Sequence, residues 1–524
     1  MTSNIQAVSD VLIANGASAL FGLMGNGNLD FIADMIDRCG IRYVSVRHES
    51  AAVAAADGYA RAGGGIGLAT VTHGPGFTNA LTALVTARRA ATPLVLITGS
   101  AMGYTQRSTQ RLDHGKVAAA LGVPVIAPAP DGDWAAAASE ALRQASEGAV
   151  LLDLPAEAMR RPASTQPVPA APHPVLPAPE LAAVTRAAQW LTQAERLMIV
   201  AGRGAARSNL RERLIALGRR HGARFGTTLA AKGYFHGVAG DVGIIGGLAG
   251  PESVAACRDC DVALVVGASL NGYTTEHGTL LSSSRVIRLD INPQAPATIG
   301  IALSLPGDPA STLRAIEALC GPAVSELAPW EIGSFQPNPA KSVEWPTPIF
   351  ELLDRLVPGE RTVVFDHGDH ATAALSHFHA NDPSQSIFMT DFGSLGLAVA
   401  AAIGAATAHP KRRTVAILGD GGLMMSLPEI DTLARSGTNV LAVVVNDGVY
   451  GAEYPHLIAL GASLEPAAFS RSRPIQGVAD ALGIRSMSIR EGDNLAAIDA
   501  FVLDAESPAL LEIICAPPSS GSAA

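Results

Sequence analysis

The chain has 524 residues and a formal net charge of -10, so its length allows three domains of ordinary size. Hydrophobic residues make up 48% and charged residues 16% of the chain, which is enough apolar material to bury several cores. The small acidic excess argues against a nucleic-acid partner, because proteins that bind a phosphate backbone carry a basic surface.

Two proline-rich stretches predict linkers that divide the chain. They run from Pro155 to about Pro179 and from about Gly321 to Pro348. Repeated proline with few large apolar residues is typical of extended linkers rather than packed elements. We therefore expect three domains, at residues 1–165, 180–320 and 347–515.

Short aliphatic runs alternate with Ala- and Leu-rich segments in every block. In chain order, the predicted strands are 43–46, 67–72 and 94–98, then 197–201, 262–266 and 285–291, then 362–365, 414–418, 440–445 and 509–514. The first block also contains predicted helices at 50–62 and 78–88. Continuous apolar strands that alternate with helices indicate parallel sheets covered on both faces. The predicted fold class is α/β, with three doubly wound parallel-sheet domains.

The first block carries polar or glycine-rich segments beside its predicted strands and helices. They are FGLMGNG (21–27), RHES (47–50), THGPGFTN (72–79) and TQRLD (109–113). Glu49 lies in the first turn of a predicted helix, where the helix dipole favours a carboxylate whether or not it is catalytic. His73 is a side chain that can move protons near neutral pH, although a single histidine also serves structural roles.

The third block contains the most informative segment, Thr414–Gly451. A predicted strand ends at GDGG (419–422), a helix follows through about Arg435, and a second strand ends at Asn446. Because the strands of one βαβ unit are parallel, their carboxyl ends share one edge of the sheet. Asp420 and Asn446 are therefore expected in one crevice. Their side-chain oxygens suit Mg²⁺, and the glycines let backbone N–H groups approach phosphate oxygens at the helix start.

Each of these turns alone would be read as a tight turn, but together they resemble the signature of thiamine-diphosphate-dependent enzymes. In that family GDG is followed, at a similar distance, by Asn. The resemblance extends from about residue 5 to 515, in the order pyrimidine-binding, middle and diphosphate-binding domain. It is closest to the superfamily of acetolactate synthase, benzoylformate decarboxylase and benzaldehyde lyase.

The resemblance implies a thiamine diphosphate and Mg²⁺ site with assigned residues. Asp420 and Asn446 would be metal ligands, and Gly448 would supply a backbone carbonyl. Leu395 would prop the cofactor into a bent shape, and His370, in FDHGDH (365–370), would contact its diphosphate. The cofactor-binding residues implied in full are Asn26, His370, Gly393, Leu395, Gly419, Gly421, Gly422 and Tyr450.

The resemblance also implies the catalytic residues Glu49, His73 and Gln110. Glu49, in RHE followed by AADGYAR, would be the carboxylate that activates the cofactor. Gln110 resembles an active-site glutamine of acetolactate synthases, and His73 replaces a serine. Met24, His73 and Thr109 depart from the acetolactate synthase pattern, which leaves the substrate open.

The middle block has glycine turns at Gly202–Ala205 and Gly267–Gly272. Acetolactate synthases place FAD in this domain, but the Arg/Asp group that accompanies it is missing here, so we expect no FAD. Glycine turns alone are a weak indication of any nucleotide. Cys257 and Cys260 have the spacing of a redox pair, but without a second pair we expect ordinary thiols.

The function implied is decarboxylation of a 2-keto acid, carboligation, or both, in the manner of acetolactate synthase. Benzoylformate-decarboxylase-like, benzaldehyde-lyase-like and hydroxyacyl-CoA-lyase-like specificities stay open. A rival from another class is a flavin or nicotinamide oxidoreductase that uses the middle block. We expect 2-keto acid or aldehyde substrates and a homodimer at minimum, with a homotetramer favoured.

The first residues resemble no secretion signal, and no apolar run reaches the 18 residues of a membrane span, so a cytoplasmic protein is expected.

Overall fold

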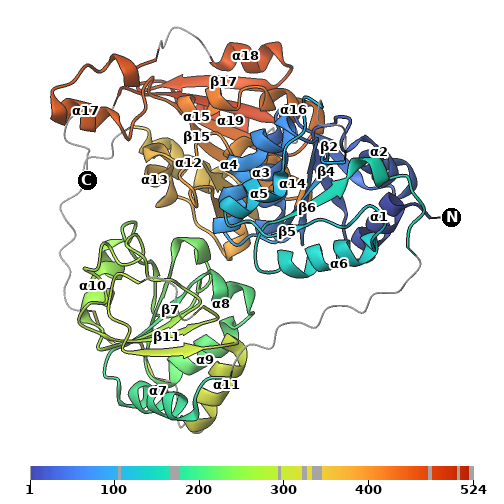
Figure 1. Ribbon diagram of the computed structural model, residues 1–524. Helices are drawn as coiled ribbons and strands as arrows, with labels where there is room; N and C mark the ends of the chain where they lie inside the picture. Colours follow the sequence, from blue (N-terminus) through green and yellow to red (C-terminus); the bar gives the residue numbers. More distant parts are fainter. Residues whose placement is uncertain are drawn as a thin grey trace. The chain divides into compact units, whose positions relative to one another are not determined.

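The computed structural model describes residues 2–103, 108–164, 178–292, 297–320, 327–332, 345–469, 475–503 and 508–517. Most of the two predicted linkers lies outside these residues. The described residues form three six-stranded parallel sheets with helices between the strands (Figure 1), which confirms the predicted fold class. No helix among them is both long enough and apolar enough to cross a membrane.

The first sheet has the strand order β2-β1-β3-β4-β6-β5. Its strands are β1 (Ala19–Gly22), β2 (Arg42–Ser45), β3 (Gly67–Val71), β4 (Leu94–Ser100), β5 (Val125–Ile126) and β6 (Val150–Pro155). Its helices and helical turns are α1 (Asn4–Ala14), α2 (Leu29–Ala33), η1 (Asp34–Arg38), α3 (Glu49–Arg61), α4 (Pro75–Arg89), α5 (His114–Ala120), α6 (Trp134–Ala145) and η2 (Ala156–Ala158).

The third sheet repeats this topology with the order β14-β13-β15-β16-β18-β17. Its strands are β13 (Arg361–Phe365), β14 (Ser386–Phe388), β15 (Arg413–Gly419), β16 (Val440–Asn446), β17 (Arg485–Arg490) and β18 (Ala509–Ile514). The helices and turns of this part of the chain are α12 (Thr347–Leu356), α13 (Asp369–Leu375), η4 (Pro383–Gln385), α14 (Ala398–Ala408), α15 (Asp420–Met425), α16 (Glu429–Ser436), α17 (Tyr454–Leu460), η5 (Glu465–Ala467), α18 (Ile475–Ala481) and α19 (Ala496–Leu503).

The middle sheet has a different order, β12-β11-β10-β7-β8-β9, which is the order of a dinucleotide-binding fold. Its strands are β7 (Leu197–Ala201), β8 (Arg224–Thr227), β9 (Asp241–Ile244), β10 (Val262–Val266), β11 (Arg285–Asp290) and β12 (Leu303–Pro306). Its helices and turns are α7 (Leu181–Gln193), α8 (Arg203–Arg207), α9 (Arg211–Arg220), η3 (Leu229–Ala231), α10 (Pro251–Asp259) and α11 (Pro309–Leu319).

The chain forms two compact units. The first and third sheets belong to one unit, made of Met1–His173, Trp345–Phe378 and Ile387–Ala524. The middle sheet belongs to the other, made of Pro174–Glu344 and His379–Ser386. The expected three-domain boundaries therefore stay a prediction, although each expected block does contain one of the three sheets.

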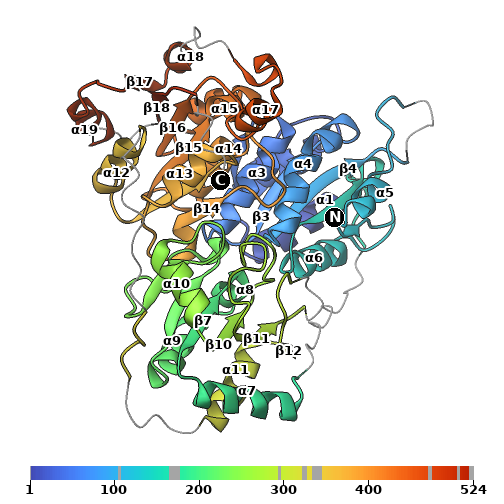
Figure 2. The same ribbon diagram turned by 90° about the vertical axis from the view of Figure 1, so that its left-hand side faces the viewer.

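Helices α3 and α14 lie side by side within the first unit and join its two sheets (Figures 1 and 2). Both are rich in alanine, and nearly all their inward residues are fully buried. Small side chains let two helix backbones approach closely, so the pair forms one continuous apolar core under both sheets. The two sheets that carry the predicted site residues are thereby held in one body.

One predicted element differs from the structure. A single helix through about Arg435 was expected after the GDGG turn, but α15 ends at Met425 and α16 begins at Glu429. Pro428 lies between them and has no N–H to donate to a continuous helix. The break turns the chain so that Glu429 becomes the first residue of α16.

Candidate active site

The predicted metal ligands lie together at the carboxyl ends of β15 and β16. Gly419 pairs with Val445 across these strands, so the next residues, Asp420 and Asn446, lie at the same level. Each is only 6% exposed. The structure thus brings together two oxygen-bearing side chains that 25 intervening positions separate in the sequence, as the parallel βαβ unit predicts.

The electrostatics of this crevice favour a bound cation. Burial, and next the nearby carboxylate of Asp447, raise the pKa of Asp420 to about 7. A divalent cation would relieve the cost of holding two acidic groups close together out of water. Gly448 adopts a φ of +71°, and its carbonyl accepts a hydrogen bond from the N–H of Phe469 at 2.6 Å. A carbonyl oxygen has a second lone pair, so this bond leaves room for a metal contact.

The glycines of the GDGG turn lie in tight contact with the groups around them. A methyl group on Gly421 would lie 3.0 Å from the Tyr450 ring, and one on Gly419 would lie 3.0 Å from Nδ1 of His370. Tyr450 in turn packs edge-on against Phe469. The predicted cofactor residues Gly419, Gly421, Tyr450 and His370 are thus one contiguous group around Asp420.

His370 supplies a second observation in favour of an anionic ligand. Its Nε2 atom is buried and has no hydrogen-bond partner among the described residues. Burial, and next the charge of His367, lower the pKa of the ring to about 4, so it is neutral at physiological pH. A buried ring nitrogen without a partner is costly, and a diphosphate oxygen would satisfy it.

The segment that carries Gly393 and Leu395 is tied to the end of β13. Asp366 accepts hydrogen bonds from the N–H groups of Gly396 at 2.8 Å and Leu397 at 3.2 Å. This carboxylate is fully buried, and burial raises its pKa to about 6. A methyl group on Gly422 would lie 2.5 Å from the Asp366 carboxylate. The half-buried Leu395 therefore stands next to the GDGG turn on a loop fixed by backbone bonds.

The predicted catalytic residues form a second group, the first-sheet group: Glu49 follows β2, His73 follows β3 and Gln110 follows β4. Glu49 is the first residue of α3, and its carboxylate accepts a hydrogen bond from Asn79 at 3.0 Å. Nε2 of His73 and Oε1 of Gln110 lie 2.7 Å apart. His73 is 3% exposed. The structure therefore brings together His73, which departs from the acetolactate synthase pattern, and Gln110, which matches it.

Asn26 lies in the turn next to His73. Its side chain is exposed, while Gly27 beside it is buried and donates its N–H to Thr72 Oγ1 at 3.0 Å. A methyl group on Gly27 would lie 2.3 Å from Nδ1 of His73. The turn that carries Asn26 is therefore packed directly onto the histidine ring.

Behind His73 lies a buried network that the sequence did not reveal. Nε2 of His114 accepts a hydrogen bond from the N–H of Gly74 at 3.0 Å. Its Nδ1 lies 3.0 Å from Asp153, which also accepts a hydrogen bond from Thr98. The contact with Asp153 fixes the ring tautomer, and the bond to Gly74 fixes the backbone that carries His73.

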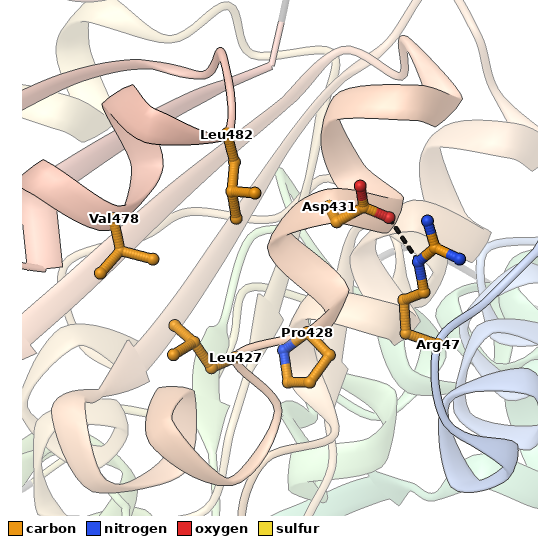
Figure 3. Close-up of a pocket in the computed structure, with 6 residues that line it drawn as sticks. All are labelled: Arg47, Leu427, Pro428, Asp431, Val478 and Leu482. Carbon is orange, nitrogen blue, oxygen red and sulfur yellow. Dashed lines mark hydrogen bonds and ion pairs between the residues drawn. The ribbon is translucent and has the colours of Figure 1, made fainter.

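Two interactions inside the first unit hold α3 against the third sheet. The carboxylate of Glu429 accepts a hydrogen bond from the N–H of Arg47 at 3.1 Å, and burial raises its pKa. The side chain of Arg47 forms an ion pair with Asp431 at 2.6 Å (Figure 3). The chain that leads into Glu49 is thereby anchored on α16.

Figure 3 also shows a hollow beside this ion pair. It is lined by Arg47, Leu427, Pro428, Asp431, Val478 and Leu482. None of these is a predicted site residue.

Sequence reasoning assigned no role to four buried residues that hold the site residues in place: Asp366, His114, Glu429 and Glu512. Each is at most 1% exposed. A signal existed for Glu512, which is the only charged residue in an otherwise apolar predicted strand, ALLEII. A carboxylate in such a strand must be buried with hydrogen-bond donors around it, and this expectation would have drawn attention to it.

In the middle sheet, the glycine turns pack on each other. A methyl group on Gly202 would lie 2.2 Å from the carbonyl oxygen of Gly267, and one on Gly204 would lie 2.7 Å from its Cα. Gly204 also donates its N–H to the Gly267 carbonyl. Close backbone packing therefore accounts for these glycines.

The two cysteines with redox spacing also lie in this domain. Burial raises the pKa of the Cys257 thiol, and it raises that of Cys260 to about 11. Both thiols are therefore poor nucleophiles.

Comparison with known proteins agrees with this geometry along the chain. Residues 4–117 match the model of the N-terminal TPP binding domain of thiamine pyrophosphate enzymes. Residues 184–316 match the central domain and residues 366–513 the C-terminal TPP binding domain. Each match lies within the part of the chain that forms one of the three sheets, and the central-domain match spans the whole middle sheet.

Individual relatives support the same assignment. The chain is 29% identical over 478 residues to the acetolactate synthase large subunit of Parasynechococcus marenigrum, covering 85% of this chain and 76% of the relative. It is 26% identical over 486 residues to the isozyme 3 large subunit of Escherichia coli, covering 86% and 83%. It is 25% identical over 566 residues to the sulfoacetaldehyde acetyltransferase of Castellaniella defragrans, covering 97% and 92%.

These matches define a thiamine-diphosphate-dependent enzyme. The chain belongs to the thiamine pyrophosphate enzyme family, and its similarity to acetolactate synthases confirms the superfamily inferred from the sequence.

Proposed function

We propose that this enzyme uses thiamine diphosphate and Mg²⁺ to decarboxylate a 2-keto acid, to join the product to a second carbonyl compound, or both, as acetolactate synthases do. The observation that carries the proposal is the crevice of Asp420 and Asn446 beside the buried, unpartnered Nε2 of His370. Its acidic part fits a hard cation, and its glycine-lined part fits a diphosphate.

The residues present fit the cofactor. Asp420, Asn446 and the carbonyl of Gly448 would hold Mg²⁺, while His370 and the GDGG turn would hold the diphosphate. When bound, thiamine diphosphate supplies the nucleophilic carbon and the electron sink that cleavage next to a carbonyl requires. Leu395, on the loop fixed by Asp366, would press on the cofactor from one side.

The first-sheet group would handle protons and substrate. Glu49 would hydrogen-bond to the aminopyrimidine ring and favour the tautomer whose nitrogen acts as a base, and Asn79 keeps the carboxylate in place. His73 and Gln110 would face the substrate carbonyl. Their mutual hydrogen bond, at 2.7 Å, sets the direction of both polar groups. Because His73 replaces a serine of the family pattern, the donor need not be pyruvate, and a benzoylformate-decarboxylase-like or benzaldehyde-lyase-like specificity is the alternative.

The assembly is a homodimer at minimum, and a homotetramer is favoured, in a cytoplasmic enzyme. The dimer rests on the family pattern, in which Glu49 acts on a cofactor held by another subunit. We propose that the middle domain binds no FAD, because the mutual packing of Gly202, Gly204 and Gly267 accounts for its glycine turns. The family matches favour a thiamine-diphosphate-dependent enzyme over a flavin or nicotinamide oxidoreductase.

Metal and cofactor depletion tests the proposal. The purified protein is dialysed against a chelator and then given thiamine diphosphate, Mg²⁺, both or neither. We expect both the melting temperature and turnover of pyruvate or benzoylformate to rise only when both are present. A melting temperature and turnover that respond to neither would overturn the proposed function. A screen of 2-keto acids and aldehydes with the restored enzyme then identifies the donor and acceptor.

A further inference from the structure

Glu512 is a buried carboxylate next to the predicted metal site that no assigned role explains. It lies on β18, between β16 and β17 (Figure 2), and is 1% exposed. Its neighbours on the strand are apolar and fully buried. A charged group in this position costs free energy unless hydrogen bonds compensate it.

Three donors from three elements meet this carboxylate. Oε1 accepts a hydrogen bond from Nδ2 of Asn446 at 2.7 Å. Oε2 accepts hydrogen bonds from Oγ of Ser488 at 2.6 Å and from the N–H of Gln476 at 3.2 Å. The first bond reaches a predicted metal ligand, while the other two tie β17 and α18 to β18.

The bond to Asn446 decides how that side chain is turned. An amide has an NH₂ end that donates and an oxygen end that accepts, and Asn446 contacts Oε1 of Glu512 through Nδ2. Asn446 must therefore present its NH₂ group to Glu512, which directs its Oδ1 to the opposite side. A metal can be bound by Oδ1 and not by the NH₂ group, so the orientation of the amide decides whether Asn446 is a ligand.

We propose that Glu512 is a positioning residue of the metal site, which orients the amide of Asn446 so that Oδ1 faces the cation. This inference rests on the proposed function, because it assumes a divalent cation between Asp420 and Asn446. Groups that orient metal ligands in this way typically contribute 10- to 100-fold to metal affinity.

Two variants of Glu512 separate orientation from charge. In Glu512→Gln, the new amide can pair with Asn446 in either direction, so the amide of Asn446 is no longer fixed. Glu512→Asp keeps the negative charge but is one methylene shorter and loses the contact. Ser488→Ala is the matched control, since it removes a different donor from the same carboxylate and leaves the Asn446 bond in place.

The measurement is metal binding rather than turnover. Each full-length protein, freed of metal, is titrated with Mg²⁺ at saturating thiamine diphosphate while its melting temperature is followed, and Mn²⁺ binding is measured by electron paramagnetic resonance. We expect Glu512→Gln and Glu512→Asp to need about 10- to 100-fold more metal than the wild type. Ser488→Ala should stay within about threefold of the wild type.

The outcomes are distinguishable. If both Glu512 variants bind metal as the wild type does, and only melt at a lower temperature without metal, Glu512 is structural and the proposal is overturned. It is also overturned if Glu512→Asp binds normally while Glu512→Gln does not, since charge alone would then explain the effect. If Glu512→Gln does not fold, the metal requirements of Glu512→Asp and Ser488→Ala are compared, and equal requirements overturn the proposal. A wild type that does not respond to Mg²⁺ contradicts the proposed function itself.

Discussion

Gly58 of α3 lies so close to Ala401 of α14 that a methyl group on Gly58 would be 2.0 Å from the Ala401 carbonyl oxygen. The contact is reciprocal, because a methyl group on Gly404 would lie 1.8 Å from the carbonyl oxygen of Ala55. Gly58 lies three residues after Ala55 in α3, and Gly404 lies three residues after Ala401 in α14. The first and third sheets, which share one topology, are thus joined through equivalent helices in equivalent contacts.

This contact predicts that Gly58→Ala destabilises the protein. The added methyl group meets backbone rather than a movable side chain, so α3 and α14 must separate. Overpacking of a tight core costs about 1–3 kcal/mol and occasionally more, and we expect at least the upper end of that range. Urea unfolding measures it. Gly359→Ala is the control, because a methyl group there meets nothing within 4 Å; equal stability of the two variants would contradict the proposed packing.

The sequence was informative about the fold where the strands are long and apolar. Strands β7, β10 and β18 begin and end at the predicted residues. The unpredicted strands include β5, with two residues, and β14, with three, which are too short to show a pattern. β17 (RSMSIR) is mostly polar and only partly buried, so its pairing with β18 decides its conformation rather than its own composition.

The candidate site was predictable where a residue lies beside a recognisable turn. Asp420 and Asn446 follow from two strand ends, because parallel topology brings such ends together. Asp366 and His114 could not be predicted in the same way, since their roles depend on backbone N–H groups at Gly396 and Gly74 that are distant in sequence. Such contacts depend on the tertiary arrangement and leave no local pattern.

Arg61 provides a second test of how the two sheets are joined. It pairs with Asp57 on its own helix at 2.7 Å and with Asp391, next to the Gly393–Leu395 loop, at 2.9 Å. Its side chain is 14% exposed. Removing one partner of a buried pair costs about 3–5 kcal/mol, so Arg61→Ala should lower the free energy of unfolding by that amount. It should also weaken binding of thiamine diphosphate, because Asp391 leads into the cofactor loop.

The control for Arg61 is Arg38→Ala. Arg38 also pairs with two carboxylates, Asp34 and Asp10, but its side chain is 37% exposed, and exposed pairs contribute about 0–1 kcal/mol. Unfolding in urea and cofactor titration by fluorescence check both variants. If the two arginine variants lose the same free energy of unfolding, the ion pairs of Arg61 stabilise the protein no more than exposed pairs do.

His370→Gln should change how stability depends on pH. The ring has a pKa of about 4 in the folded protein, against about 6.5 in an unfolded chain. Between these values the unfolded chain binds a proton that the folded one does not, so this histidine lowers stability as the pH falls from about 6.5 to 4. The full effect is on the order of 3 kcal/mol.

The comparison of wild type and variant isolates that effect. Asp366, whose pKa burial raises to about 6, acts in the opposite sense, but it is present in both proteins and cancels in the difference. We expect the stability of the His370→Gln apoprotein, from urea unfolding at pH 7.5 and pH 5, to fall less on acidification than that of the wild type. If wild type and variant lose the same free energy of unfolding between pH 7.5 and pH 5, His370 is not held neutral in the folded protein.

Glu49→Gln should lower kcat by about 10²- to 10⁴-fold, the usual contribution of a positioned acid or base. Glutamine can still accept the hydrogen bond of Asn79, so the melting temperature and the Mg²⁺-dependent binding of thiamine diphosphate should be unchanged. If cofactor binding disappears together with activity, Glu49 holds the fold or the cofactor and does not act on it.

Mixing this variant with Asp420→Ala tests which chains share a site. If Glu49 of one subunit serves the metal site of the other, a mixed dimer has one intact site and one with both defects, and regains about half the activity of a wild-type dimer. If both residues of a site come from the same chain, every site in the mixture carries one defect and the activity stays at the level of the single variants. Co-expression with two affinity tags isolates the mixed dimer, and its turnover decides between the two arrangements.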